Sequence, residues 1–265
     1  MDDLIDHLSG GALAELRRQR PDIRGRAEAA YRALVTPDIP GGVSLPERAA
    51  LAYRVARGEE DPHLAAHYRG LLEAVATPDE LTIAGAADPG GPGRFVLLMR
   101  YGDVVARHPA RVDQAAIDAL RAHGLSPQDV VAATQLAAFV PFQVRVLAGL
   151  RAMAGDDAPL PEVPPPVRAP GNYTMAEVPW IPRLPPVDAA TATPEQLLAL
   201  DNCPPAQRRS TYFLTLALDP SSLAERGALF ERVMYAPRGL PRAERELATA
   251  IKRARFLALL PYVVS

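Results

Sequence analysis

The chain contains few residues whose type and spacing could support chemistry, and Cys203 is its one cysteine. Cys203 lies in the sequence Asp-Asn-Cys-Pro-Pro, which predicts a loop, and no histidine is close to it in the sequence. A reactive cysteine needs a base, a cation or a helix N-terminus that stabilises its thiolate. A one-cysteine peroxidase is therefore one interpretation of Cys203, but its neighbours favour an inert cysteine.

Two histidines, His63 and His67, are four residues apart in a segment that predicts a helix, so their side chains share a face. Such a pair can bind zinc only with a further ligand, and zinc proteases carry a glutamate directly after the first histidine. Leu64, Ala65 and Ala66 separate the two histidines here. We therefore predict surface or packing histidines, no metal site and no other cofactor.

The segment 88–93, Asp-Pro-Gly-Gly-Pro-Gly, precedes a predicted helix and has the glycine content of a phosphate-binding loop. Such loops follow a strand and end in Lys and then Ser or Thr, and both features are missing. The segment is better interpreted as a flexible connection. Gln143, a polar residue within an apolar run, either lines an internal cavity or is a buried amide satisfied by the backbone.

The elements that must position these residues are predicted to be helices. Capping residues stand before helical patterns of apolar residues at several places: Ser44, Asp61, Asp113, Ser126 and Thr193. The segment 130–153 is long and very apolar, which is typical of a core helix, and Pro141 inside it indicates either a kink or two helices. Convincing strand patterns are absent from the sequence, so we predict an all-α fold.

Composition narrows the class of protein. Apolar residues make up 48% of the 265 residues and the net charge is −2, so the chain can bury a core but has no basic footprint for nucleic acid. The N-terminus lacks the pattern of a signal peptide, and no apolar stretch reaches the roughly 20 residues that span a bilayer. We therefore expect a cytoplasmic protein with no nucleic-acid or membrane partner.

Proline divides the chain. Residues 155–192 are rich in proline and are predicted to form a strap, in which Tyr173, Trp180 and Ile181 suit packing on a domain surface. The strap would join an N-terminal helical domain, 1–154, to a C-terminal domain, 193–265. The segment 240–247 and the following apolar residues echo 125–129 and the helix after it, which suggests two related helical halves.

The segment 234–247, Met-Tyr-Ala-Pro-Arg-Gly-Leu-Pro-Arg-Ala-Glu-Arg-Glu-Leu, resembles the carboxymuconolactone decarboxylase and alkyl hydroperoxidase D superfamily, in particular a two-domain, peroxidase-related branch. The resemblance extends to 125–153, 180–182 and 211–213. It implies an all-α homo-oligomer that reduces peroxides with a Cys-x-x-Cys pair, a histidine and a relay glutamate. A small apolar molecule or a peroxide is the substrate that it suggests.

Glu246 matches the relay glutamate, so the resemblance makes it the one candidate catalytic residue. The alternative is a structural charge that complements its helix dipole or forms an ion pair. The family's cysteine and histidine positions hold other residues in both halves: Ala258, Pro261 and Ser265 in the second, and Gln143, Val146 and Leu150 in the first.

Two explanations of the missing cysteines stay open at this point. Either the chain is truncated or frame-shifted after about Thr249, which we favour, or the protein has lost its redox chemistry. The expected function is that of an alkylhydroperoxidase-like thiol peroxidase that is catalytically incomplete in this chain. The alternative is a non-catalytic helical scaffold that binds an apolar ligand or a partner protein.

Overall fold

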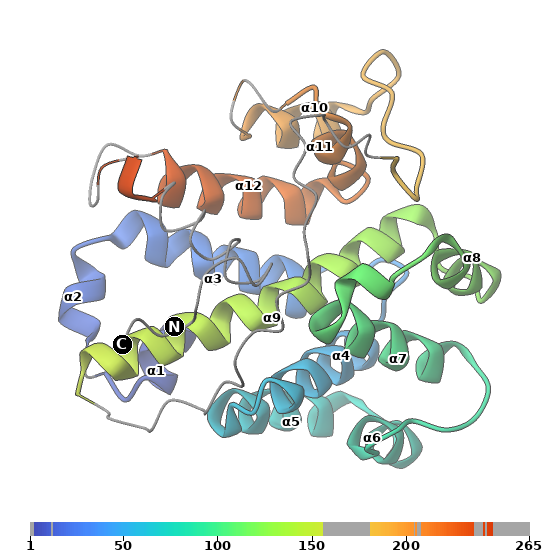
Figure 1. The fold of residues 1–265 in the computed structure, drawn as a ribbon, viewed down its shortest axis with the longest axis horizontal. Coiled ribbons are helices and arrows are strands. Elements are labelled where there is room, and N and C mark those ends of the chain that lie inside the picture. Colours follow the sequence, from blue (N-terminus) through green and yellow to red (C-terminus); the bar gives the residue numbers. More distant parts are fainter. Residues whose placement is uncertain are drawn as a thin grey trace, which may run out of the picture.

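The fold is known from a computed structural model, which describes residues 3–11, 13–155, 181–203, 205, 208–235, 241 and 243–245. Within these ranges every regular element is a helix, which confirms the predicted all-α class (Figure 1). The elements in chain order are α1 (Leu4–Leu8), α2 (Ala14–Arg18), α3 (Pro21–Val35), α4 (Leu45–Gly58), α5 (Pro62–Val75), α6 (Pro78–Gly85), α7 (Arg94–Arg107), the 3₁₀ turn η1 (Pro109–Arg111), α8 (Gln114–Ala122), α9 (Pro127–Met153), α10 (Pro194–Asp201), α11 (Thr211–Leu216) and α12 (Pro220–Met234).

The predicted helix starts are confirmed by hydrogen bonds. Each predicted capping side chain accepts a bond from a backbone N–H in the first turn of its helix: Ser44, Asp61, Asp113, Ser126 and Thr193. At Ser126 a reciprocal bond from Asp129 completes a capping box. α6 is not among the predicted helices, although Thr77 and Glu80 form the same type of box at its start.

The long apolar segment is a single helix, α9, that continues through Pro141. A proline removes one backbone hydrogen bond from a helix, and tertiary contacts can compensate that loss. α9 has such contacts, because it packs against α3, α4, α7 and α8. Among the described residues α9 passes the length and composition test for a membrane span, but 67% of its apolar window is buried in the fold.

α9 runs through the middle of the molecule, and other helices pack on opposite sides of it (Figure 1). α4 packs against α5, α7 and α9, and α12 lies along α3, a helix far from it in the sequence. The main hydrophobic cluster accordingly includes Leu136 of α9 and Leu229 of α12. A smaller cluster beside α10 and α11 contains Leu200, Cys203 and Phe213.

The predicted strap and the sequence echo fall mostly outside the described residues. Tyr173 and Trp180 are among those left out, and Ile181 is 79% exposed, so its predicted packing is wrong. The chain is instead held a few residues later, where Leu184 and Val187 are buried. The two related halves and the domain limits stay predictions, because the second copy of the echo is described only at 241 and 243–245.

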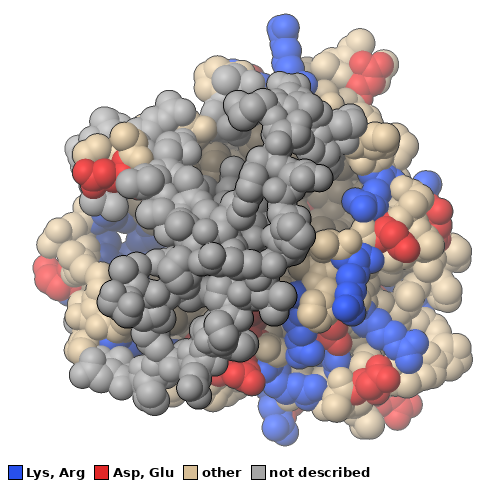
Figure 2. All heavy atoms as spheres, viewed as in Figure 1, with Lys and Arg blue, Asp and Glu red and all other residues tan. Residues whose placement is uncertain are grey.

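The described surface carries mixed charge. On the face drawn in Figure 2, basic and acidic side chains lie close to one another rather than forming one patch of a single sign. Surface ion pairs such as Arg69–Glu73 on α5 and Arg26–Glu225 between α3 and α12 fit this distribution.

Candidate functional site

Two adjacent cavities lie between α9, α11 and α12. The larger, of about 560 Å³, is lined by Gln135, Ser210, Tyr212, Phe213, Leu216, Leu223, Arg226, Gly227 and Phe230. The smaller, of about 250 Å³, extends along α9 toward α7 and α8 and is lined mainly by aliphatic side chains, among them Val112, Ile117, Val130, Val131, Leu184 and Leu216. Four residues line both cavities, which places them side by side: Gln135, Tyr212, Leu216 and Arg226. We call the two cavities together the α9–α12 site.

A hydrogen-bonded pair of side chains stands where the two cavities meet. Arg226 of α12 donates from Nη1 to Oε1 of Gln135 on α9, at 2.7 Å. Gln135 is 2% exposed, and its Nε2 has no acceptor among the described residues. Burial lowers the pKa of the Arg226 guanidinium from its ordinary value, because the charged form loses solvent. The pair therefore combines a desolvated cation with a buried, unused N–H donor.

The backbone that carries this pair is well anchored. The capping box at Ser126 starts α9, and Leu136, the neighbour of Gln135, is fully buried in the main cluster. On α12 the residues Leu223 and Leu229 are buried and hold the helix against the rest of the molecule. Side chains on rigid elements of this kind are held in a defined geometry.

The smaller cavity has a polar end of its own. The hydroxyls of Tyr101 on α7 and Thr134 on α9 lie 2.6 Å apart and share a hydrogen bond. Burial raises the pKa of the Tyr101 hydroxyl, so it is neutral at physiological pH. Arg183, an exposed residue, also lines this cavity. No aspartate or glutamate is present among the described residues that line either cavity, whereas two arginines are.

Cys203 is buried between α10 and α12. Its Sγ donates to the carbonyl oxygen of Ala199 at 3.5 Å, and a Cβ added to Gly227 would lie 2.9 Å from the sulfur. Burial raises the pKa of the Cys203 thiol to about 11, although the charge of Arg208 acts in the opposite direction. The thiol is thus protonated at neutral pH, which is the opposite of the state that peroxide attack requires.

The two histidines of α5 do not act as a pair. His63 is exposed, whereas His67 Nε2 lies 2.9 Å from the Tyr31 hydroxyl and its ring packs against Tyr68. Burial lowers the pKa of His67 and raises that of Tyr31 to about 12, so both groups are neutral at pH 7. They line a third cavity, of about 770 Å³, which Glu28 also lines. The Tyr31 hydroxyl and Nε2 of His67 are hydrogen-bonding partners of each other.

The chain just before the glycine-rich segment 88–93, at the end of α6, directs its carbonyl groups toward a cation. Arg54 donates from Nη1 to the carbonyl oxygens of Ala84 and Ala86, at 3.1 and 2.7 Å, and it also pairs with Asp103. Residues 88–93 themselves lie between α6 and α7, so among the described residues a helix rather than a strand precedes them, unlike a phosphate-binding loop. The interpretation as a connection is the one that fits the structure.

Gln143 proves to be a satisfied interior amide. Its Oε1 accepts a hydrogen bond from the hydroxyl of Tyr68 at 2.5 Å, so a side chain rather than the backbone provides the partner. Gln143 is 2% exposed and Tyr68 is fully buried. This hydrogen bond ties α9 to α5. It occupies the Tyr68 hydroxyl and the Gln143 side-chain oxygen, so neither group is available to a ligand.

Glu246, the candidate relay residue, lies outside the described residues, as do Ala258, Pro261 and Ser265. Among the residues that the structure does describe, no cluster of three or more histidine, cysteine, aspartate or glutamate side chains is arranged to hold a metal ion.

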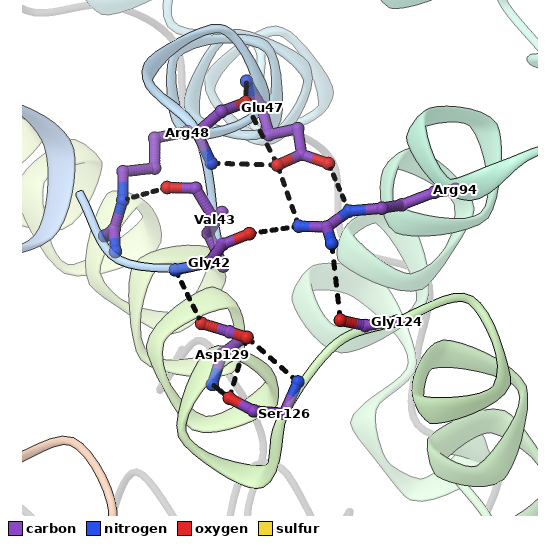
Figure 3. Close-up of polar contacts among 9 residues, drawn as sticks. Gly42, Val43, Glu47, Arg48, Arg94, Gly124, Ser126 and Asp129 are labelled. Carbon is purple, nitrogen blue, oxygen red and sulfur yellow. Dashed lines mark hydrogen bonds and ion pairs between the residues drawn. The ribbon is translucent and has the colours of Figure 1, made fainter.

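The densest polar network has a structural role. Arg94 of α7 pairs with Glu47 at the start of α4, with 2.7 Å between Nε and Oε1, and donates to the carbonyl oxygens of Gly42 and Gly124 (Figure 3). Asp129 closes the network, because it caps α9 and accepts from the backbone N–H of Gly42 at 3.0 Å. Each charged group is satisfied within the protein, so the network joins three helix starts and leaves no group for a substrate.

Arg226 and Gln135 are not among the site residues predicted from the sequence. Gln135 carried a usable signal, since it is a polar residue in the same apolar run as Gln143. Arg226 carried none, because it is one of several arginines that follow acidic residues along predicted helices.

Comparisons with known proteins do not place the chain in a family. No protein-family model, no curated protein and no solved structure matches it.

Proposed function

We propose that this protein is a non-catalytic helical binding protein that holds a small, predominantly apolar molecule in the α9–α12 site. The observation that carries this proposal is the pair of adjoining cavities with a mainly aliphatic and aromatic lining and few polar groups. Apolar pockets with a small number of placed polar groups are typical of small-molecule sites. The proposal corresponds to the second of the two functions expected from the sequence.

The state of Cys203 supports a binding role over thiol chemistry in the described part of the chain. The thiol is 2% exposed, and burial raises its pKa to about 11. An alkylhydroperoxidase-like activity, as the resemblance implies, remains a proposal about residues outside the described part, including Glu246. We also propose, on the resemblance alone, a homo-oligomer, which light scattering after gel filtration would test. From the sequence pattern we propose a cytoplasmic location, which cell fractionation would test.

A neutral, environment-sensitive dye such as Nile red tests the binding function. We expect saturable, one-to-one enhancement of its fluorescence by the wild-type protein. Ala138→Phe should weaken binding, because Ala138 lines the smaller cavity and the larger side chain would occupy it. Ala66→Phe is the matched control, since Ala66 is an exposed residue of α5 that lines none of the cavities described above.

The outcomes separate the two functions. Absence of saturable binding, or equal binding by both phenylalanine variants, would contradict a site between α9 and α12. Consumption of tert-butyl hydroperoxide in the presence of a dithiol, abolished by Cys203→Ala, would instead support the peroxidase function.

A further inference from the structure

The polar groups of the α9–α12 site restrict the chemistry of its ligand, provided that the proposed binding function holds. Arg226 and Arg183 line the site, and no acidic residue does so among the described residues. The partner of Arg226 in the described structure is an amide oxygen, which carries no charge. A partly buried guanidinium without a carboxylate is unfavourable, since a desolvated charge needs a counter-charge.

Gln135 adds a second donor at the same point. Its Oε1 accepts from Arg226, and this bond determines how the amide is oriented, because the opposite orientation would set its N–H₂ group against the guanidinium. The Nε2 of this residue is therefore an N–H donor that is buried and lacks an acceptor among the described residues. A buried donor without an acceptor is destabilising, so an acceptor from a bound molecule would account for it.

Both features call for the same partner. An anionic oxygen at the junction of the cavities would neutralise Arg226 and accept from Nε2 of Gln135. The rest of the smaller cavity is lined mainly by aliphatic residues, which include Ile117, Val131 and Leu184, and these offer apolar contact to the body of the ligand. Arg226 is the one described guanidinium that lines both cavities, because Arg183 is exposed and lines the smaller cavity alone. A small carboxylate suits one guanidinium and one amide, whereas a phosphate dianion would require more cations.

We propose that the ligand of the α9–α12 site is a monocarboxylate with an apolar chain or ring, whose carboxylate binds Arg226 and Gln135. The apolar body lies in the smaller cavity against α7 and α8, and Tyr212 and Phe230, both exposed, stand at the edge of the larger one. The inference rests on the proposed binding function and adds the charge and the orientation of the ligand.

Decanoate and decan-1-ol form the test pair, because they share a chain length and differ in the head group. Isothermal titration calorimetry of the wild-type protein at pH 7.5 should show decanoate binding about tenfold or more tightly than decan-1-ol, as a charge-assisted hydrogen bond predicts. This comparison needs no variant, so it stands even where a substitution disturbs folding.

Variants locate the carboxylate. Arg226→Met keeps the aliphatic stem and should weaken decanoate binding by about tenfold to a hundredfold while leaving decan-1-ol binding unchanged. Gln135→Met should produce a smaller loss in the same direction. Arg232→Met is the matched control: Arg232 lies on the same helix with its side chain 51% exposed, and its substitution should change neither affinity.

Each outcome has one meaning. Equal affinity for decanoate and decan-1-ol, with no effect of Arg226→Met, would overturn the carboxylate inference and leave the binding function in place. Loss of both ligands in Arg226→Met, with circular dichroism unchanged, would show that the residue shapes the cavity rather than binding an anion, and would also overturn the inference. Binding of neither compound, together with absence of dye binding, would overturn the proposed function itself.

Discussion

At the scale of single residues, the chemistry of this protein is governed by burial. Cys203, His67 and Arg226 all have pKa values displaced in the direction that burial imposes, toward the neutral form. For Cys203 and His67 the neighbouring groups are packing or hydrogen-bonding partners. Only at Arg226 does burial coincide with a cavity and with a donor that lacks a partner.

The raised pKa of Cys203 predicts that its thiol reacts slowly with disulfide reagents. With a pKa of about 11, roughly a thousandth of the thiol is ionised at pH 8. We expect native protein to react with Ellman's reagent at least about 100-fold more slowly than protein unfolded in urea, because the thiolate is the reacting species. Equal rates in the two states would show that Cys203 is accessible and activated, and would reopen the peroxidase function.

The lowered pKa of His67 predicts a pH effect on stability. The folded state disfavours protonation of His67, whereas the unfolded chain protonates it near its ordinary pKa of about 6.5. The contribution of His67 to the free energy of unfolding is therefore fully present above pH 6.5. It is lost as the pH falls from 6.5 through the lower pKa that His67 has in the folded state. Urea unfolding between pH 8 and 5 should show this decline.

His67→Gln should flatten the decline, and His63→Gln, at an exposed position of the same helix, is the matched control. A pH profile that is the same in wild type and His67→Gln would contradict the assignment of this effect to His67.

At the scale of elements, the helices depend on caps and on close packing of side chains against neighbouring helices. α7 approaches α4 at Gly102, where an added Cβ would lie 2.0 Å from Cδ1 of Leu51. Gly102→Ala should therefore lower the free energy of unfolding by about 1–3 kcal/mol through overpacking. Gly70→Ala in α5, which would meet no atom within 4 Å, should raise it by about 0.5–1 kcal/mol. Urea denaturation measures both, and a neutral Gly102→Ala would contradict this close approach.

The network in Figure 3 predicts that two similar capping boxes contribute different amounts to the free energy of unfolding. Asp129 completes the box at the start of α9 and also binds the N–H of Gly42, whereas Glu80 completes an exposed box on α6 alone. Asp129→Ala should lower the free energy of unfolding by about 2 kcal/mol or more, and Glu80→Ala by about 1 kcal/mol or less. Equal losses would mean that the bond to Gly42 contributes nothing.

At the scale of the whole molecule, α12 connects the C-terminal part of the chain to the N-terminal helices. Leu229 of α12 is 7% exposed and belongs to the main cluster, so Leu229→Ala should cost about 2–4 kcal/mol and shift a single unfolding transition. The exposed pair Arg26–Glu225 should contribute about 1 kcal/mol or less, so Arg26→Gln is the control. A separate, early transition for the C-terminal part in calorimetry would contradict this coupling.

The sequence by itself determined the all-α class and most helix starts. Caps such as Ser126 and Thr193 act within one turn, so local residue types specify them. The same local signal was present for α6 at Thr77 and Glu80 and was overlooked. The burial of α9 was also predictable from its apolar composition. Whether α9 continues through Pro141 was not predictable, because contacts with other helices determine it.

Only the tertiary structure decided the site. Arg226 and Gln135 are 91 residues apart in the chain, and they meet because α12 packs back onto the N-terminal helices. Folding also buries Cys203 and brings the Tyr31 hydroxyl to His67. Cys203 and His67 therefore lose the reactivity that their residue types allow. Local patterns specify which segments are helices, whereas burial and the pairing of polar groups depend on contacts between distant segments, which no local pattern encodes.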